Sequence, residues 1–258
     1  MTFLTDMIFP PRCALCDKVI ISSEEHICDE CRKMLVYIKQ PTCFKCGKEI
    51  DSSDDEYCYD CSRHQRSYVR GYPVFNYVPP ISESLQMFKY SDRQEYAAFF
   101  GSEIVKRYGD TFRRIGVDVI IPVPVHKKKY LKRGYNQAGL IASDIGRRLG
   151  IMVVDDLLVR SEDTRPQKEL NPDEREQNLL NAFSLNGRCA ELGSLIGNNE
   201  NMRTRGRLTL LLVDDIYTTG ATVEGCTRAL KNMVKTVDKI SEKTIVDVYY
   251  TSVAIGKV

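Results

Sequence analysis

The sequence lacks any long hydrophobic run, and its 258 residues carry nearly equal numbers of positive and negative side chains. No apolar stretch approaches the roughly 20 residues that a membrane-spanning helix needs, so we expect no membrane insertion. The first ten residues place no basic side chain ahead of their apolar ones and contain no small-residue cleavage site, which argues against a secretory signal and for a cytoplasmic protein. With 37 basic and 35 acidic residues, bulk charge does not by itself indicate nucleic-acid binding.

Histidine is also scarce, and two common kinds of active site are not expected. Of the three histidines, only His126 lies outside the cysteine-rich N-terminal part, so a Ser-His or Cys-His nucleophilic centre is disfavoured. The chain contains no G-x-x-x-x-G-K-[ST] segment, which excludes a P-loop nucleotide site. Cys226 falls in a helical pattern and is expected to be a small buried residue, and Cys189 has no evident partner.

Eight of the ten cysteines fall before residue 62, in four pairs whose members are separated by two residues. Eleven residues separate each pair from the next, and the segment repeats with a period of 30 residues. Two thiolates at this spacing can bind one Zn²⁺ ion from a tight turn, so two pairs complete a closed, structural four-cysteine site. The predicted zinc ligands are Cys13, Cys16, Cys28, Cys31, Cys43, Cys46, Cys58 and Cys61.

The pairing of these cysteines is open between two arrangements. Each 30-residue repeat contains a complete ligand set, so the simplest is a tandem double zinc ribbon with the first four cysteines on one ion and the last four on the other. Interleaved pairing, as in cross-braced domains, is the alternative, and a reducing cytoplasm disfavours a disulfide framework. We assign residues 1–66 to the double zinc ribbon and residues 67–258 to a second domain.

After residue 66 the chain alternates segments typical of strands and helices. Two short apolar runs, 117–121 and 208–213, have the composition of strands buried on both faces. The alternation predicts an α/β domain with a parallel sheet flanked by helices. The further expected elements are strands at 72–78 and 245–254, helices at 81–90, 94–108, 137–149 and 221–233, and a mobile polar surface loop at 186–207.

Two adjacent acids, Asp214 and Asp215, follow the second buried strand. Ligands of open α/β sheets bind at the carboxyl ends of the strands, which is where these acids are expected. Carboxylates accept hydrogen bonds from neutral hydroxyls and can approach a hydrated Mg²⁺ ion. The acids therefore predict contact with a sugar, with Mg²⁺ nearby.

A hydroxyl-rich loop separates these acids from the next predicted helix. The start of a helix favours a phosphate, because its backbone N–H groups and its dipole point toward the anion. Thr218, Thr219 and Thr222 can direct their hydroxyls to the same dianion, and Gly220 lets the backbone approach closely. Together with the acids, the loop predicts a site for a sugar phosphate.

The other buried strand leads into a proline-containing turn and then into five basic residues between Lys127 and Arg133. Because carboxyl ends of parallel strands share one edge of a sheet, this basic loop is expected near Asp214, where it can neutralise an anionic ligand. A solvated run of charge is the alternative interpretation for Lys127, Lys128 and Lys129.

Two segments resemble known families. The segment Leu210 to Thr222 resembles the phosphoribosyl pyrophosphate (PRPP) motif of type I phosphoribosyltransferases, and Arg133-Gly134-Tyr135-Asn136-Gln137 resembles the signature of the ComF family. That family also has an N-terminal cysteine-rich zinc region and a lysine after an apolar helix, here Lys89. The tract at 186–207 looks longer than the family's usual connection. A further similar stretch is carried by Arg160, Thr164, Gln167, Leu170, Arg175, Asn178, Ala182 and Phe183.

The resemblance implies a fold, a ligand and a set of site residues. It implies a type I phosphoribosyltransferase-like sheet that binds PRPP with Mg²⁺, in which Asp214 and Asp215 bind the ribose hydroxyls and are the catalytic residues. The residues that it implies for PRPP binding are Thr218, Thr219, Gly220, Ala221 and Thr222 at the 5′-phosphate, and Val123, Pro124, Val125, His126, Arg133 and Lys89 toward the pyrophosphate. The residues that either line the ligand entrance or brace it are Arg160, Gln167, Arg175 and Asn178.

Three functions fit these features. The first is an enzyme that transfers ribose 5-phosphate from PRPP to an acceptor that the sequence does not name. The second is a module that handles single-stranded DNA through its basic loop and ribbons, with proteins of the DNA-uptake machinery as partners. The third is a regulator that senses PRPP without turning it over, since a fold does not fix a function. We favour a PRPP-binding, phosphoribosyltransferase-type domain whose biological context is DNA uptake in natural transformation.

Overall fold

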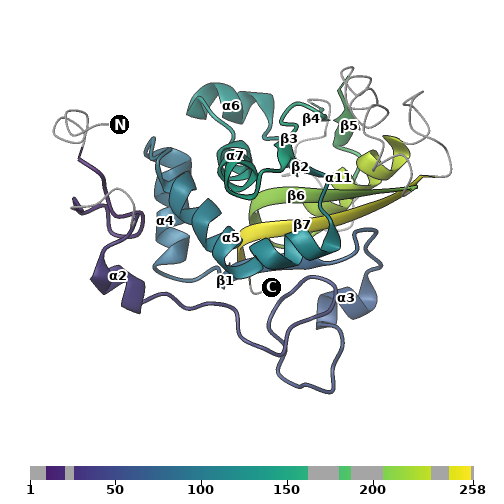
Figure 1. Ribbon diagram of the computed structural model, residues 1–258, viewed down its shortest axis with the longest axis horizontal. Helices are drawn as coiled ribbons and strands as arrows, with labels where there is room; N and C mark the ends of the chain where they lie inside the picture. The colour runs from purple at the N-terminus through teal and green to yellow at the C-terminus, as the bar shows by residue number, and fades with distance from the viewer. Residues whose placement is uncertain (1–9, 21–25, 162–179, 187–205, 234–243, 257–258) are drawn as a thin grey trace, which may run out of the picture.

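A five-stranded sheet forms the centre of the computed structural model, which describes residues 10–20, 26–161, 180–186, 206–233 and 244–256 (Figure 1). The strand order is β1-β7-β6-β2-β3, and every pair of neighbours runs parallel. The predicted class, an α/β fold with a parallel sheet, is confirmed. The strands are β1 (Gly71–Asn76), β2 (Val119–Pro122), β3 (Met152–Val153), β6 (Arg207–Tyr217) and β7 (Ile245–Ile255).

Helices cover both faces of this sheet. Helices α4 (Ile81–Tyr90), α5 (Tyr96–Ile115) and α7 (Gln137–Leu149) share one hydrophobic core with Leu211 and Val213 of β6. Helix α11 (Ala221–Asn232) shares the core on the other face. Successive side chains of a strand point to opposite faces, so burial on both sides explains the unbroken apolar run of β6. Among the described residues, no helix combines the length and apolarity needed to cross a membrane.

Several elements differ from those expected. Strand β6 continues past Val213 to Tyr217, because β7 runs beside it as far as Ile255 and supplies hydrogen-bonding partners. The expected basic loop is a short helix, α6 (Lys127–Arg133). The sequence pattern also missed β3 and a separate antiparallel pair, β4 (Leu158–Arg160) with β5 (Phe183–Leu185). Most of the tract expected as a loop at 186–207 lies outside the described residues.

The period of 30 residues in the N-terminal part is a structural repeat. The bond from the Cys13 N–H to the Lys18 carbonyl, 2.8 Å long, recurs between Cys43 and Lys48 at the same length. The bridge between Arg12 and Val19 likewise recurs 30 residues on. Each copy ends in a short helix, α2 (Asp29–Lys33) and α3 (Tyr59–Arg63). We call the copies the first and the second ribbon.

The two ribbons pack on opposite faces of the sheet. Buried residues of the first ribbon, including Cys13 and Leu15, join the core formed by α4 and α5. Buried residues of the second ribbon, including Cys43 and Cys46, join the core formed with α11. Helices α2 and α3 accordingly lie far apart in Figure 1.

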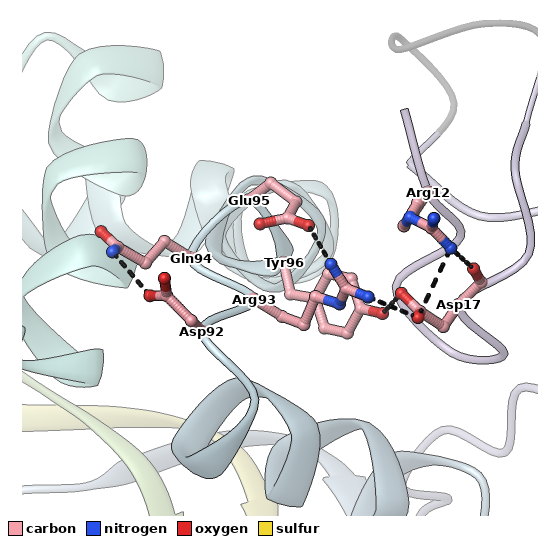
Figure 2. A network of polar contacts seen from close by, with 7 residues as sticks. All are labelled: Arg12, Asp17, Asp92, Arg93, Gln94, Glu95 and Tyr96. Carbon is pink, nitrogen blue, oxygen red and sulfur yellow. Dashed lines mark hydrogen bonds and ion pairs between the residues drawn. The ribbon is translucent and has the colours of Figure 1, made fainter. Parts of the chain in front are cut away.

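The first ribbon is attached to the connection between α4 and α5 through Asp17. The guanidinium of Arg93 donates to Asp17 Oδ2 at 2.6 Å, and the Tyr96 hydroxyl donates to Asp17 Oδ1 at 2.7 Å, as Figure 2 shows. Asp17 follows the ligand position Cys16 and has a φ of 59°. The residue at the same place in the second ribbon is Gly47, with a φ of 74°.

We expect Asp17→Ala to destabilise the protein by about 1–3 kcal/mol, because it removes the carboxylate that accepts hydrogen bonds from a partly buried guanidinium and a buried hydroxyl. The matched control is Asp110→Ala. Asp110 also pairs with an arginine, Arg113 at 3.0 Å, but its side chain is 92% exposed. This control should change the free energy of unfolding by less than about 0.5 kcal/mol. Urea unfolding measures both, and equal losses in the two variants would contradict the prediction.

Candidate functional site

The eight N-terminal cysteines form two compact groups. In each group all four Sγ atoms lie within 4.8 Å of one another. Each group draws its four members from one repeat, so the grouping is the tandem arrangement rather than the interleaved one. Four thiolates at this separation suit a tetrahedral Zn²⁺ ion with a closed coordination shell, which is the character of a structural site. Of the described residues, no histidine belongs to either group.

The two acids of β6 have different surroundings. Asp215 Oδ2 lies 2.7 Å from Nζ of Lys89, which is in the last turn of α4. Asp214 Oδ1 instead accepts a hydrogen bond from the backbone N–H of Asp215 at 2.8 Å. Because both acids belong to a regular strand, their side chains leave it on opposite faces. Only Asp215 faces the side of the sheet where α4 supplies a cation.

The surroundings of Asp214 change the pKa of its carboxyl group. Burial raises the pKa of Asp214 well above its usual value, and the nearby charge of Asp215 raises it further. The hydrogen bond from the backbone N–H of Asp215 and the charge of Lys89 act in the opposite direction but do not cancel the rise. The pair therefore combines one carboxylate next to a cation with one carboxyl group that holds its proton more tightly than usual.

The loop after β6 turns into α11 at a glycine. Gly220 has a φ of 81° and caps the N-terminus of α11. A Cβ atom at this position would lie 2.2 Å from the Tyr217 hydroxyl, so glycine is required both by the backbone conformation and by the close contact. The Thr219 carbonyl accepts a hydrogen bond of 2.9 Å from the guanidinium of Arg66. We call residues 218–222 the phosphate loop, after the ligand that the sequence predicts for it.

A cavity of about 350 Å³ lies where β2 and β6 end. It is within the range of sizes typical of small-molecule sites. Four basic side chains line it against two carboxylates, which favours an anionic ligand. The lining residues used below are Lys89, Val123, Pro124, Val125, Lys129, Arg133, Gln137, Arg160, Asp214, Asp215, Thr218 and Thr222.

Four residues expected at this site do not line the cavity. His126 caps α6, where its Nδ1 accepts a hydrogen bond of 3.1 Å from the Lys128 N–H. Thr219, Gly220 and Ala221 lie in the phosphate loop, but their side chains or Cα atoms are not among the lining groups. Gly220 and Ala221 are buried, whereas Thr219 is exposed.

The turn after β2 forms the opposite wall. The Val123 N–H donates to the Val213 carbonyl at 2.9 Å, which ties this turn to β6. The Val123 carbonyl accepts from Asn136 Nδ2 at 3.0 Å. Arg133 lies over the ring of Tyr90, 4.9 Å from its centroid, and donates to Gln137 Oε1 at 3.1 Å. These contacts hold Arg133 at the cavity rather than in solvent.

Gln137 is a lining residue that the sequence-based reasoning named in the ComF-like signature but did not assign to the site. Its side chain is 3% exposed, and its Nε2 has no hydrogen-bonding partner among the described residues. The same is true of Nε of Arg160. Unused buried donors are rare in proteins, so both groups suit an acceptor on a ligand. The sequence signal that could have assigned Gln137 to the site is its position as a polar residue at the start of a helix whose next residues are apolar.

Other residues named from the sequence are placed differently or are not described. Cys226 is fully buried in α11, as expected of a core residue. Cys189 and the resemblance-derived residues Thr164, Gln167, Leu170, Arg175 and Asn178 lie outside the described residues.

Comparisons with known proteins agree with this architecture. A family model described as the double zinc ribbon domain matches residues 4–62. Competence protein F of Haemophilus influenzae is 29% identical over 163 residues, a match that covers 62% of this chain and 66% of that protein. DNA utilization protein YhgH of Escherichia coli K12 is 29% identical over 153 residues, covering 58% and 60%. Competence protein ComFC of Bacillus subtilis is 28% identical over 160 residues, covering 61% and 56%.

The fold and the cysteine groups define a class of protein, a parallel α/β domain of the phosphoribosyltransferase-like type joined to a double zinc ribbon. The relatives agree with this class, because the chain is similar over 58–62% of its length to proteins named for competence and for DNA utilization. The matched region spans less than two thirds of the length of each of these relatives.

We expect removal of the two carboxylates to change stability in opposite directions. The pKa of Asp214 is raised on folding, so the folded state binds its proton more tightly and stability falls as the pH rises above the usual carboxyl pKa of 3.8. Asp214→Asn removes this penalty and should raise Tm by about 2–4 °C at about pH 8. Asp215→Asn leaves Lys89 without its partner and should lower Tm at the same pH.

Thermal unfolding followed by circular dichroism between about pH 3 and about pH 8 measures these changes. The gain from Asp214→Asn should disappear near pH 3, where the carboxyl group is protonated in both the folded and the unfolded states. A gain of the same size at both ends of the range would show that protonation is not its cause.

Proposed function

We propose that the chain binds PRPP together with Mg²⁺ in the cavity between β2 and β6 and transfers ribose 5-phosphate to an acceptor. The observation that carries this proposal is the composition of one cavity of about 350 Å³. Two carboxylates, two threonine hydroxyls and four basic side chains line it together. A ligand with sugar hydroxyls at its centre and phosphates at both ends matches all three kinds of group.

Each group has a role that follows from its chemistry. Asp214 and Asp215 accept hydrogen bonds from the ribose hydroxyls, and the phosphate loop binds the 5′-phosphate at the start of α11. Val123, Pro124 and Val125 border the pyrophosphate end. Lys129 and Arg133 neutralise the charge of the pyrophosphate, and Gln137 and Arg160 donate further hydrogen bonds to it.

The reaction needs no nucleophile from the protein. The acceptor supplies an electron pair to the anomeric carbon, and the bond to pyrophosphate breaks as positive charge develops on the sugar. The protein holds both reactants in line and places Asp214 and Asp215 close to the developing charge. The carboxylate oxygens are the ligands that Mg²⁺ prefers, and the ion would neutralise the pyrophosphate.

A second cavity supports transfer rather than binding alone. It has a volume of about 600 Å³ and shares Pro124, Val125, Asn136 and Arg160 with the first cavity. Adjoining cavities with a common wall give an acceptor a place beside a bound sugar phosphate. The names of the relatives refer to competence and to DNA utilization, so we propose DNA uptake as the biological context.

Titration calorimetry with PRPP and Mg²⁺ tests the proposal directly. The wild-type protein should bind, and Asp215→Asn should weaken binding by about 10–100-fold, because it removes a charged acceptor of hydrogen bonds. Asp247→Asn is the matched control. Asp247 pairs with Arg207 at 2.7 Å and is 17% exposed, close to the 2.7 Å and 15% of Asp215, but it does not line the cavity.

The outcomes separate two functions and also show whether the PRPP site exists. Release of pyrophosphate with any acceptor in a panel supports the enzyme. Tight binding without release across the panel favours a PRPP-sensing regulator instead. Absence of binding by the wild-type protein, or equal weakening in both variants, refutes the PRPP site.

A second candidate function is supported by α6, which carries aromatic and basic groups on an exposed surface. Lys127, Lys128, Lys129 and Tyr130 are exposed, and Leu131 is 74% exposed. Tyr90 lies next to Arg133 and is 69% exposed. Basic side chains beside exposed aromatic rings are the groups that bind single-stranded nucleic acids, through phosphate contacts and base stacking. We propose this surface as a site for single-stranded DNA.

Affinity for a single-stranded oligonucleotide should fall as salt is raised. Replacement of Lys127, Lys128, Lys129 and Lys132 by glutamine should reduce the slope of log K against log salt by about 0.7 for each phosphate that the variant no longer neutralises. Replacement of Lys106, Arg113 and Arg114, which are exposed on α5, is the matched control and should leave the slope unchanged. Fluorescence anisotropy measures both, and an unchanged slope in the α6 variant would remove this surface from the function.

A further inference from the structure

Three buried tyrosines lie between the second ribbon and the phosphate loop, and we call them the tyrosine trio. The rings of Tyr217 and Tyr250 are stacked, with centroids 4.9 Å apart and an interplanar angle of 10°. The ring of Tyr68 meets Tyr250 edge-on at 5.1 Å, and its hydroxyl lies 2.9 Å from that of Tyr217. The three residues come from the chain after the second ribbon, from the end of β6 and from β7, so the trio joins segments that are distant in sequence.

The trio contacts the second zinc site directly. The Tyr250 hydroxyl donates a hydrogen bond of 2.7 Å to the backbone carbonyl of Cys46, one of the four clustered cysteines. The adjoining turn is fixed to β1, because the Gly71 N–H donates to the Lys45 carbonyl at 2.8 Å. A Cβ atom on Gly71 would lie 2.2 Å from the Tyr250 ring, so the turn, β1 and the ring are in close contact.

The trio also supports the phosphate loop. Tyr217 is the residue immediately before Thr218. Its hydroxyl packs so closely against Gly220 that a methyl group on Gly220 would collide with it. The chain after the second ribbon adds two further contacts. Arg66 donates to the Thr219 carbonyl, and the Ser67 N–H and hydroxyl donate to the carboxylate of Glu224 in α11 at 2.6 and 2.7 Å.

Each hydroxyl of the trio has a hydrogen-bonding partner within the protein. The Cys46 carbonyl can only accept, so Tyr250 is the donor in that bond. A packed interior of this kind deforms little, so a displacement at one end is passed to the other.

We propose that Tyr68, Tyr217 and Tyr250 are positioning residues that couple the second zinc site to the phosphate loop. An ion shared with Cys58 and Cys61 holds the Cys43–Cys46 turn more firmly in one conformation, and the Cys46 carbonyl is oriented with that turn. Zn²⁺ on the second ribbon then strengthens binding of a sugar phosphate, and by reciprocity the sugar phosphate slows loss of that Zn²⁺. The identity of the ligand rests on the proposed function, whereas the coupling of ribbon to loop does not.

The first ribbon provides the contrast. Its link to the core is also a tyrosine hydroxyl, from Tyr96 to Asp17, but it lies on the opposite face of the sheet. Tyr96→Phe and Tyr250→Phe therefore remove the same atom from two buried tyrosines, each bonded to a ribbon. Only Tyr250→Phe is expected to alter the conformation or the dynamics of the phosphate loop.

Three measurements on the full chain test the coupling. Titration calorimetry with ribose 5-phosphate should show a loss of affinity of about three- to tenfold in Tyr250→Phe and none in Tyr96→Phe. Hydrogen exchange of the backbone amides at 218–222 should accelerate in Tyr250→Phe alone. Release of Zn²⁺ to a chromogenic chelator should slow for one of the two ions when ribose 5-phosphate is added.

The outcomes are distinguishable from those of the proposed function. If the wild-type protein binds neither PRPP nor ribose 5-phosphate, the proposed function fails and hydrogen exchange alone decides the coupling. Equal exchange at 218–222 in the wild-type protein and Tyr250→Phe would overturn the coupling. Binding of ribose 5-phosphate with no change in Zn²⁺ release would overturn it as well. If Tyr250→Phe does not fold, Tyr217→Phe, which removes the Tyr68 to Tyr217 bond, replaces it in all three measurements.

Discussion

The parallel pairing of β2 with β6 is the interaction on which the site depends. Pro122 lies opposite Val213 in the register, so the end of β2 lies beside the residue that precedes Asp214 and Asp215. The turn after β2 is bonded back to β6, and α6, α7 and α11 all begin close to this end of β2. A site that draws on residues more than 100 positions apart in sequence thus follows from a few backbone hydrogen bonds.

The pleat of β6 then gives two chemically identical side chains different environments. Asp214 and Asp215 are neighbours in sequence, yet only Asp215 has a lysine at 2.7 Å, because α4 lies on one face alone. Asp214 faces the side where Arg160 and Cys226 contribute to its surroundings. An adjacent pair of acids at the end of a buried strand is therefore a way to place two carboxyl groups in different surroundings from one short segment.

Local patterns in the sequence predicted those parts of the structure that depend on local chemistry. The start of α11 follows from Gly220, the two metal groups follow from the spacing of the cysteines, and α7 follows from its apolar periodicity. Features set by distant partners were not predictable in this way. The extension of β6 to Tyr217 needs β7, and the unused amide of Gln137 and the ribbon contacts of Tyr250 appear only after folding.

The residues Asp17 and Gly47 show how the two copies of the internal repeat differ. They occupy equivalent places 30 residues apart, yet Asp17 provides an anion for Arg93, whereas a Cβ atom at Gly47 would lie 2.6 Å from Pro73. Copies that share one metal-binding framework have thus specialised for opposite faces of the same sheet. They are no longer interchangeable, and transplanting either one into the other's location would abolish an attachment or create a collision. The residue at this one position, Asp17 or Gly47, therefore determines which face of the sheet each ribbon can pack against.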